Sequence, residues 1–77
     1  SMNKYEEALK KLNKVQLYKP DFDKADKLYY YVGKCYQNLN DTRKAIAVYQ
    51  KIIDEHPQSS YVYWASIRLE ELAITTQ

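Results

Sequence analysis

Apolar side chains recur every three or four residues in four separate stretches of the chain. This spacing places the apolar positions along one face of an α-helix. The pattern therefore predicts helices over about residues 3–18, 23–39, 41–56 and 59–75. The expected inner faces are Tyr5, Ala8, Leu9, Leu12 and Val15; Ala25, Leu28, Tyr29, Val32, Tyr36 and Leu39; Ala45, Val48, Tyr49 and Ile52; and Val62, Ala65, Leu69, Leu72 and Ala73.

The residues between these stretches are typical of helix ends. Pro20 and Pro57 each follow a stretch, and proline stops a helix. Asn38 and Asn40 lie around the end of the second stretch, and asparagine tolerates the left-handed conformation that closes helices. Favoured N-cap residues precede the last three stretches, namely Asp21 or Asp23, Asp41, and Ser59 or Ser60. Because the connections are short, neighbouring helices should be antiparallel, which predicts an all-α fold of helical hairpins.

The chain also repeats itself. Setting Pro20 against Pro57 gives an offset of 37 residues, and apolar residues then align without a gap. The aligned pairs are Ala8 with Ala45, Leu12 with Tyr49, Val15 with Ile52, Ala25 with Val62, Leu28 with Ala65, and Val32 with Leu69. An internal period of this length indicates an array of helical hairpins.

One stretch of the sequence resembles the signature of the tetratricopeptide repeat family. That signature is an aromatic residue, an aliphatic residue with glycine, tyrosine, alanine, an aromatic residue, a small or aliphatic residue, and proline. The matching positions are Tyr29, Val32, Gly33, Tyr36, Ala45, Tyr49, Ile52 and Pro57. Ile52 is bulkier than the alanine usually found at its position.

The resemblance implies a fragment of a right-handed solenoid of four helices. Residues 3–18 would be the second helix of a partial repeat, 23–57 a complete repeat, and 59–75 the first helix of a third repeat or a cap. Gly33 is expected where two helices cross closely, with Ala45 facing it from the partner helix. Glycine costs about 1 kcal/mol in a helix interior, and close packing is the expected compensation.

The period of 37 residues exceeds the usual ~34. The longer period and the closing Ala65, Arg68, Leu69 and Leu72 resemble a variant found in bacterial cell-envelope proteins. Examples are the Tol-Pal accessory protein and the outer-membrane assembly lipoprotein. Ser1 and Met2 look like the remnant of a removed expression tag, so the natural start and any targeting segment are expected to be missing. The compartment therefore stays open between the cell envelope and the cytoplasm.

The composition of the chain limits the kinds of functional site that it can hold. The chain has 77 residues, a net charge of +2, and one residue each of Cys, His and Gly. A single Cys and a single His exclude a disulfide within the chain and a Cys/His metal site, and one glycine excludes a glycine-rich phosphate loop. No apolar run approaches the ~20 residues of a membrane span. We therefore expect no metal, no cofactor and no membrane-spanning segment.

The residue types that often act in catalysis have structural explanations in this sequence. His56 lies before a helix-ending proline, where a cation favours the helix dipole. Cys35 is expected to be an inert, partly buried thiol, although Lys34 beside it could lower a thiol pKa. The acidic residues Asp21, Asp23 and Asp41 are explained by helix capping. We therefore expect a protein that is not an enzyme.

The family resemblance implies a concave groove that binds a peptide or partner protein. The residues expected in this groove are Lys27, Tyr30, Lys34, Gln37 and Asn38 from the second helix, and Trp64, Ile67, Arg68 and Glu71 from the fourth. Aromatic residues and arginine are favoured at interfaces.

Three other interpretations remain open. The surplus aromatic residues could cover a missing neighbouring repeat rather than contact a partner. The open terminal helix faces could be buried by self-association into a homo-oligomer. The lysines of the first helix could bind nucleic acid, although Glu6 and Glu7 balance them and a solvated face is the favoured interpretation.

Overall fold

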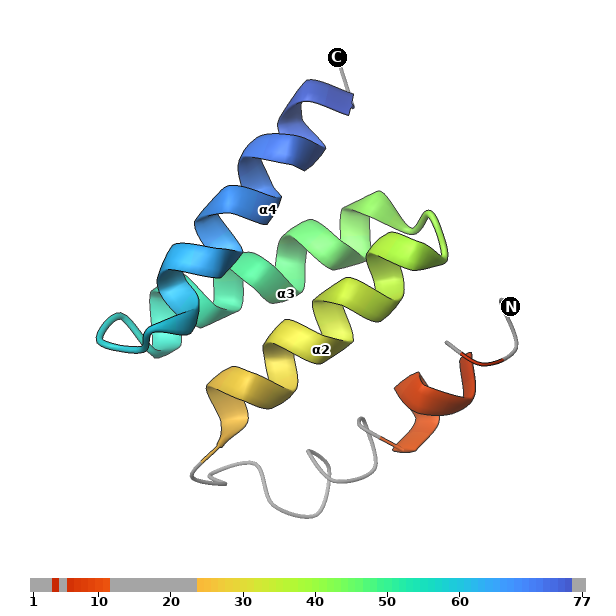
Figure 1. The fold of residues 1–77 in the computed structure, drawn as a ribbon, viewed down its shortest axis with the longest axis horizontal. Helices are drawn as coiled ribbons and strands as arrows, with labels where there is room; N and C mark the ends of the chain where they lie inside the picture. The colour runs from red at the N-terminus through yellow and green to blue at the C-terminus, as the bar shows by residue number, and fades with distance from the viewer. Residues whose placement is uncertain (1–3, 5, 12–23, 76–77) are drawn as a thin grey trace.

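The computed structural model describes residues 4, 6–11 and 24–75 (Figure 1). These residues form three full helices, α2 (Ala25–Asn38), α3 (Thr42–Glu55) and α4 (Tyr61–Thr75), after a short helical segment over residues 6–11. The described residues contain no strand, which confirms the all-α fold. The predicted extension of the first helix to residue 18 lies outside the described residues. So do the predictions for Tyr5, Leu12, Val15, Pro20, Asp21 and Asp23.

The helices follow one another as antiparallel neighbours. In Figure 1, α3 runs back along α2, and α4 then turns back again, so that α2 and α4 diverge from a common end. α3 packs against both of the other helices, whereas α2 and α4 contact each other over fewer residues. This geometry leaves the sides of α2 and α4 that face each other only partly covered.

The turn between α2 and α3 is built without glycine. Asn40 has a φ of 62°, the left-handed conformation that asparagine tolerates. The Asn40 amide donates to the Gln37 carbonyl at 3.1 Å, and the Asp41 amide donates to the Tyr36 carbonyl at 2.9 Å. These two bonds satisfy the last carbonyls of α2 in a Schellman motif. The Asp41 side chain then accepts from the Lys44 amide at 3.3 Å, which caps α3 as predicted.

The connection from α3 to α4 is also held locally. The His56 amide closes α3 on the Ile52 carbonyl at 2.8 Å, just before Pro57. The Ser59 hydroxyl accepts from the Tyr61 amide at 3.0 Å, so this serine caps the start of α4 as predicted. The same hydroxyl donates to a carboxylate oxygen of Asp26 on α2. The start of α4 is thereby tied to the start of α2.

The core has two parts. The larger cluster joins α2, α3 and α4 and contains Ala25, Tyr29, Tyr30, Ala45, Tyr49, Ile52, Ala65 and Leu72. The smaller cluster joins the first helical segment to α2 through Leu9, Val32 and Cys35. Ala45, Tyr49, Ile52 and Ala65 have no exposed surface, so the centre of the molecule lies around α3.

Gly33 marks a close approach of α2 and α3, as the sequence indicated. A Cβ atom added at Gly33 would lie 2.6 Å from Cε1 and 2.8 Å from Cζ of Tyr49. The nearest atoms therefore belong to the Tyr49 ring rather than to Ala45, the residue expected to face the glycine. Ala45 is fully buried in the same cluster.

Candidate functional site

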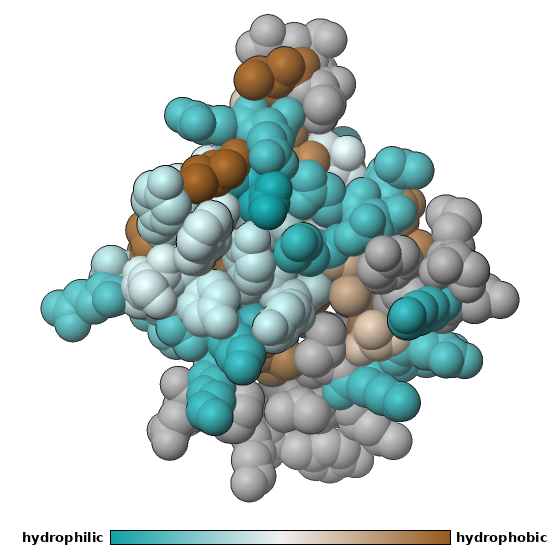
Figure 2. Space-filling model, in the orientation of Figure 1, coloured by the Kyte–Doolittle hydropathy of each residue, from teal (hydrophilic) through white to brown (hydrophobic). Residues whose placement is uncertain are grey.

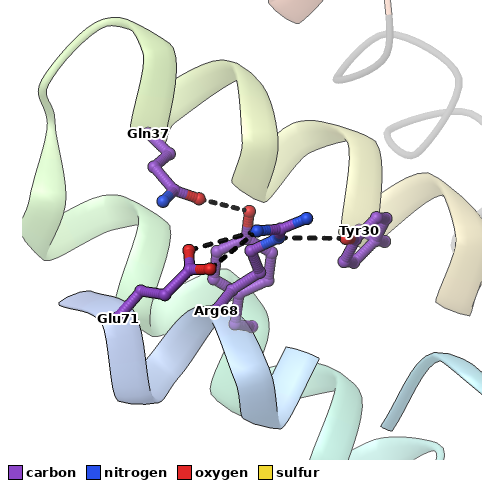
Figure 3. Close-up of polar contacts among 5 residues, drawn as sticks. Tyr30, Gln37, Arg68 and Glu71 are labelled. Carbon is purple, nitrogen blue, oxygen red and sulfur yellow. Dashed lines mark hydrogen bonds and ion pairs between the residues drawn. The ribbon is translucent and has the colours of Figure 1, made fainter. Parts of the chain in front are cut away.

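Polar side chains from α2 and α4 meet where the two helices face each other (Figure 3). The Arg68 Nε atom of α4 donates to the Tyr30 hydroxyl of α2 at 3.2 Å. One terminal nitrogen of Arg68 also donates to both carboxylate oxygens of Glu71, at 3.0 and 3.1 Å. The hydrogen bonds to Tyr30 and Glu71 raise the pKa of Arg68 further above its ordinary value. Arg68 therefore stays charged and links the two helices.

A second polar contact lies beside the first. The Tyr49 hydroxyl, which comes from α3, donates to the Gln37 side-chain carbonyl of α2 at 2.9 Å. Burial is the main reason that the pKa of Tyr49 lies well above its ordinary value, and the neighbouring Tyr30 raises this pKa further. The Tyr49 hydroxyl is therefore a neutral donor, and its hydrogen bond fixes the Gln37 amide at this place.

Tyr30 and Gln37 are better described as the floor of this region than as its open surface. Tyr30 is 9% exposed. Its ring lies 5.4 Å from that of Tyr61 and 5.8 Å from that of Tyr49, measured between centroids. Aromatic pairs at such separations contribute about 0.5–1.5 kcal/mol beyond the burial of their surface. Loss of the Tyr30 side chain would therefore weaken the packing of α2, α3 and α4 as well as any binding.

The open surface of the region is formed by other residues predicted for the groove. Trp64 of α4 is 48% exposed, and Lys27 and Asn38 of α2 are also exposed. Lys34 is half-buried, and the Asn38 amide donates to its carbonyl at 2.8 Å. Within the described part of the chain, neither Lys27 nor Lys34 belongs to an ion pair. Two positive charges on α2 are thus left without a described acidic partner.

Tyr31, which was not among the residues predicted for the groove, is exposed beside Lys27. Tyr31 is 47% exposed, and the Lys27 ammonium lies 5.9 Å from the centre of its ring. The signal was available, because Tyr31 follows Lys27 by one helical turn and therefore lies on the same side of α2. Ile67 is half-buried.

We use the term groove surface for Lys27, Tyr31, Lys34, Asn38, Trp64, Arg68 and Glu71, with Tyr30 and Gln37 as its floor. Figure 2 shows that the surface between α2 and α4 is mostly hydrophilic or of intermediate hydropathy in that view. More hydrophobic side chains appear towards the C-terminal end of α4.

The end of the molecule at which α3 meets α4 holds the only histidine. The His56 ring lies 5.7 Å from the Tyr29 ring, and the Lys51 ammonium lies 4.9 Å from the centre of Tyr29. Asp26 has a lowered pKa, chiefly because it accepts the Ser59 hydrogen bond. These contacts join the ends of the three helices.

Two further features concern chemistry. Burial raises the pKa of the Cys35 thiol, which disfavours the reactive thiolate form. Among the residues that the structure describes, no three His, Cys, Asp or Glu side chains are grouped as metal ligands would be.

The described helices were also compared with the length and hydropathy that a membrane-spanning helix needs, and none of them reaches both.

Antiparallel helices joined by short turns, with a small residue at a close crossing, are the arrangement of a helical-hairpin module. In a comparison with protein families, the model of the tetratricopeptide repeat matches residues 27–59. These residues cover most of α2, all of α3 and the turn into α4. The match supports a tetratricopeptide assignment for this part of the chain. Searches among curated proteins and among solved structures found no match.

Tetratricopeptide repeats generally mediate contacts between proteins and are non-catalytic modules. The resemblance to the cell-envelope variant stays a prediction.

Proposed function

We propose that this protein is a non-catalytic adaptor that binds a peptide or a partner protein on its groove surface. The observation that carries the proposal is the combination of a tetratricopeptide match over residues 27–59 with exposed rings at Tyr31 and Trp64 beside that hairpin. Large aromatic side chains are the residues most often responsible for binding energy at interfaces.

The arrangement of floor and open surface supports this proposal. The hydrogen bonds of Arg68 with Tyr30 and of Tyr49 with Gln37 hold the floor in place before any partner arrives. A surface that is already ordered loses less conformational entropy when it binds. The exposed rings and lysines above this floor then supply the variable contacts.

The test is to remove the exposed rings without disturbing the floor. A partner is first captured with the protein and identified, and its affinity is then measured for the double variant Tyr31→Ala/Trp64→Ala. We expect affinity to fall by at least about tenfold, because two anchors at an interface are each worth more than about 1 kcal/mol. Tyr30 is unsuitable for this test because it is buried.

The matched control is Ile74→Ala. This side chain is 75% exposed and lies on the side of α4 away from Ala65 and Leu72. Tyr63 is unsuitable as a control because its ring lies 5.2 Å from the Trp64 ring, measured between centroids. The control variant should keep the affinity of the original protein. Unchanged affinity in Tyr31→Ala/Trp64→Ala, with both variants folded, would show that the groove surface does not bind the partner.

A second candidate function is self-association through the outer side of α4. The observation that favours it is the exposure of Tyr63 and Ile74, two large side chains on the outer side of α4. Light scattering across a wide concentration range tests this candidate. A dimer that Tyr63→Lys/Ile74→Lys converts to a monomer would support it, and a monomer at every concentration would exclude it.

Binding of nucleic acid is disfavoured in this proposal. The exposed lysines of the first helical segment, Lys10 and Lys11, follow the exposed acids Glu6 and Glu7 by one helical turn. Opposite charges at this spacing offset each other. Strongly salt-dependent retention of the protein on a polyanion would contradict this statement.

A further inference from the structure

We infer that α4 pairs with α4 of a second copy of the chain in the antiparallel direction, so that Tyr63 of each copy packs on Ile74 of the other. The inference rests on the second candidate function, self-association, and adds the contact surface and its direction. Its basis is a set of residues along α4 that we call the outer row, namely Tyr63, Ile67, Glu70 and Ile74.

The distribution of apolar residues sets α4 apart from α2 and α3. α4 is the most apolar of the three full helices, and its apolar residues are spread around it rather than gathered on one side. Ala65 and Leu72 are buried on its inner side, whereas Tyr63 is 65% and Ile74 is 75% exposed. Helices that are apolar all round are normally buried. The outer side of α4 is therefore a surface that a partner should cover.

A further repeat helix does not fit this side in the way that α3 fits α2. The offset of 37 residues that aligns α2 with α4 places Glu70 at the position of Gly33. On α2 this position has no side chain, and a Cβ atom there would lie 2.6 Å from the Tyr49 ring. A helix packed equally closely on α4 would have to bury the Glu70 carboxylate, and burial of an unpaired charge is costly. The partner therefore needs another packing geometry.

The outer row has the spacing of a coiled-coil seam. Its members follow one another at intervals of four, three and four residues, as the a and d positions of a heptad do. This spacing suits a helix that runs along α4 at a small angle. The row is also symmetric about its midpoint, so an antiparallel copy sets Tyr63 against Ile74 and Ile67 against Glu70. A two-fold pair requires a surface that is complementary to itself in this way.

Glu70 favours the antiparallel direction over the parallel one. In a parallel pair in register, the two Glu70 carboxylates would lie opposite each other, and like charges placed in this way oppose association. In the antiparallel pair each Glu70 lies at the level of Ile67 of the other copy, and the two carboxylates are offset by about 4.5 Å along the axis. A single polar residue in a seam fixes direction and register at some cost in stability.

The outer row shares no residue with the groove surface. The pairing therefore leaves the groove surface of each copy open, and the pair presents two of them. Two linked sites bind a partner with two recognition segments more tightly than one site does. Because the row is only about three helical turns long, we expect the pair to form at high protein concentration.

The test is a disulfide trap that distinguishes the two directions. Cys35 is first replaced by alanine, because it is the only cysteine of the protein. Tyr63→Cys and Ile74→Cys are then prepared as separate chains in this background, and circular dichroism checks that both are folded. An equal mixture of the two chains is oxidised at about millimolar concentration, and the linked dimers are identified by mass. The antiparallel mixed dimer brings the two thiols together and keeps one unaltered contact between Tyr63 and Ile74.

We expect mixed dimers to exceed each dimer of identical chains by at least about tenfold. In an antiparallel dimer of identical chains the two thiols are separated by about 16 Å along the axis, which is beyond the reach of a disulfide. Parallel pairing would link identical chains instead, and random collision would give mixed and identical dimers in the statistical ratio of about two to one. Either result overturns the inference.

A second measurement needs no cysteine. Glu70→Leu makes the outer row fully apolar, so it should lower the dissociation constant of the dimer by at least about tenfold in sedimentation equilibrium. Glu55→Leu makes the same chemical change at an exposed position of α3 and is the matched control, which should leave the constant unchanged. Equal effects of the two substitutions would show that the outer row is not the contact surface.

The outcomes separate this inference from the proposed functions. A monomer at every concentration excludes self-association and the inference together. A dimer that links identical chains keeps self-association and overturns only the antiparallel pairing. Neither result concerns binding on the groove surface, which the variant Tyr31→Ala/Trp64→Ala decides.

Discussion

Replacement of Gly33 by alanine is the sharpest test of the packing between α2 and α3. In an ordinary helix interior this change stabilises the protein by about 1 kcal/mol, because alanine is the better helix former. Here the new methyl group would lie 2.6, 2.8 and 2.9 Å from three carbon atoms of the Tyr49 ring. Distances below 3.0 Å cannot persist, so one of the two side chains or helices must move.

The Tyr49 ring is poorly able to move. It has no exposed surface, it packs 5.8 Å from the Tyr30 ring, and its hydroxyl is held by Gln37 at 2.9 Å. Extra atoms in a well-packed core typically cost about 1–3 kcal/mol. After subtraction of the helix-propensity gain of about 1 kcal/mol, we expect Gly33→Ala to lower the free energy of unfolding by about 0–2 kcal/mol.

The assay is urea unfolding followed by far-ultraviolet circular dichroism, with the same slope against urea required for each variant. A double-mutant cycle identifies the cause. With Tyr49→Leu the ring edge is gone, so Gly33→Ala should become stabilising there, giving a coupling of about 1–3 kcal/mol, which is the overpacking cost. If Gly33→Ala stabilises the original protein, the close approach is not a constraint and the reasoning is refuted.

The remaining predictions concern single hydrogen bonds and the thiol. Asp26→Asn should remove a stabilising contribution that exists above the unfolded pKa of about 4 and disappears as the pH falls through the lowered folded pKa; urea midpoints that differ equally at all pH values would contradict this. Tyr49→Phe should lower the free energy of unfolding by about 0.5–1.5 kcal/mol, since it leaves Gln37 without its donor; no change in the urea midpoint would refute it. Cys35 should react with a disulfide reagent far more slowly in the folded protein than in denaturant, because it is buried and its pKa is raised; equal rates would show that the thiol is accessible.

The helix boundaries could be predicted because they depend on neighbouring residues. Asn40 supports the left-handed turn and Asp41 caps α3, and both effects act within about four residues. Ser59 acts in the same local way at the start of α4. The bond from Ser59 to Asp26 was not predicted, because 33 residues separate the two in the chain. Only the folded hairpin brings them together.

The division between floor and open surface could not be predicted for the same reason. Helical spacing puts Lys27, Tyr30, Lys34 and Gln37 on one side of α2, and it treats the four alike. The exposure of these four side chains differs because α4 covers part of that side. Arg68 donates a hydrogen bond to Tyr30, and Tyr61 packs on the Tyr30 ring. The extent of this cover depends on the angle between α2 and α4, which no local pattern encodes.

The contact at Gly33 could be predicted only in part. The sequence indicated a close crossing because a glycine in a helix interior needs compensation, yet it assigned Ala45 as the facing residue. Long side chains in a helix point back towards its N-terminus, so the ring of Tyr49 extends over the preceding turn, where Ala45 lies. A larger residue at 45 would compete with the ring for that space, since both residues are fully buried in one cluster. The small residue at 33 is thus required by the Tyr49 ring, and Ala45 is buried in the same cluster one helical turn before that tyrosine.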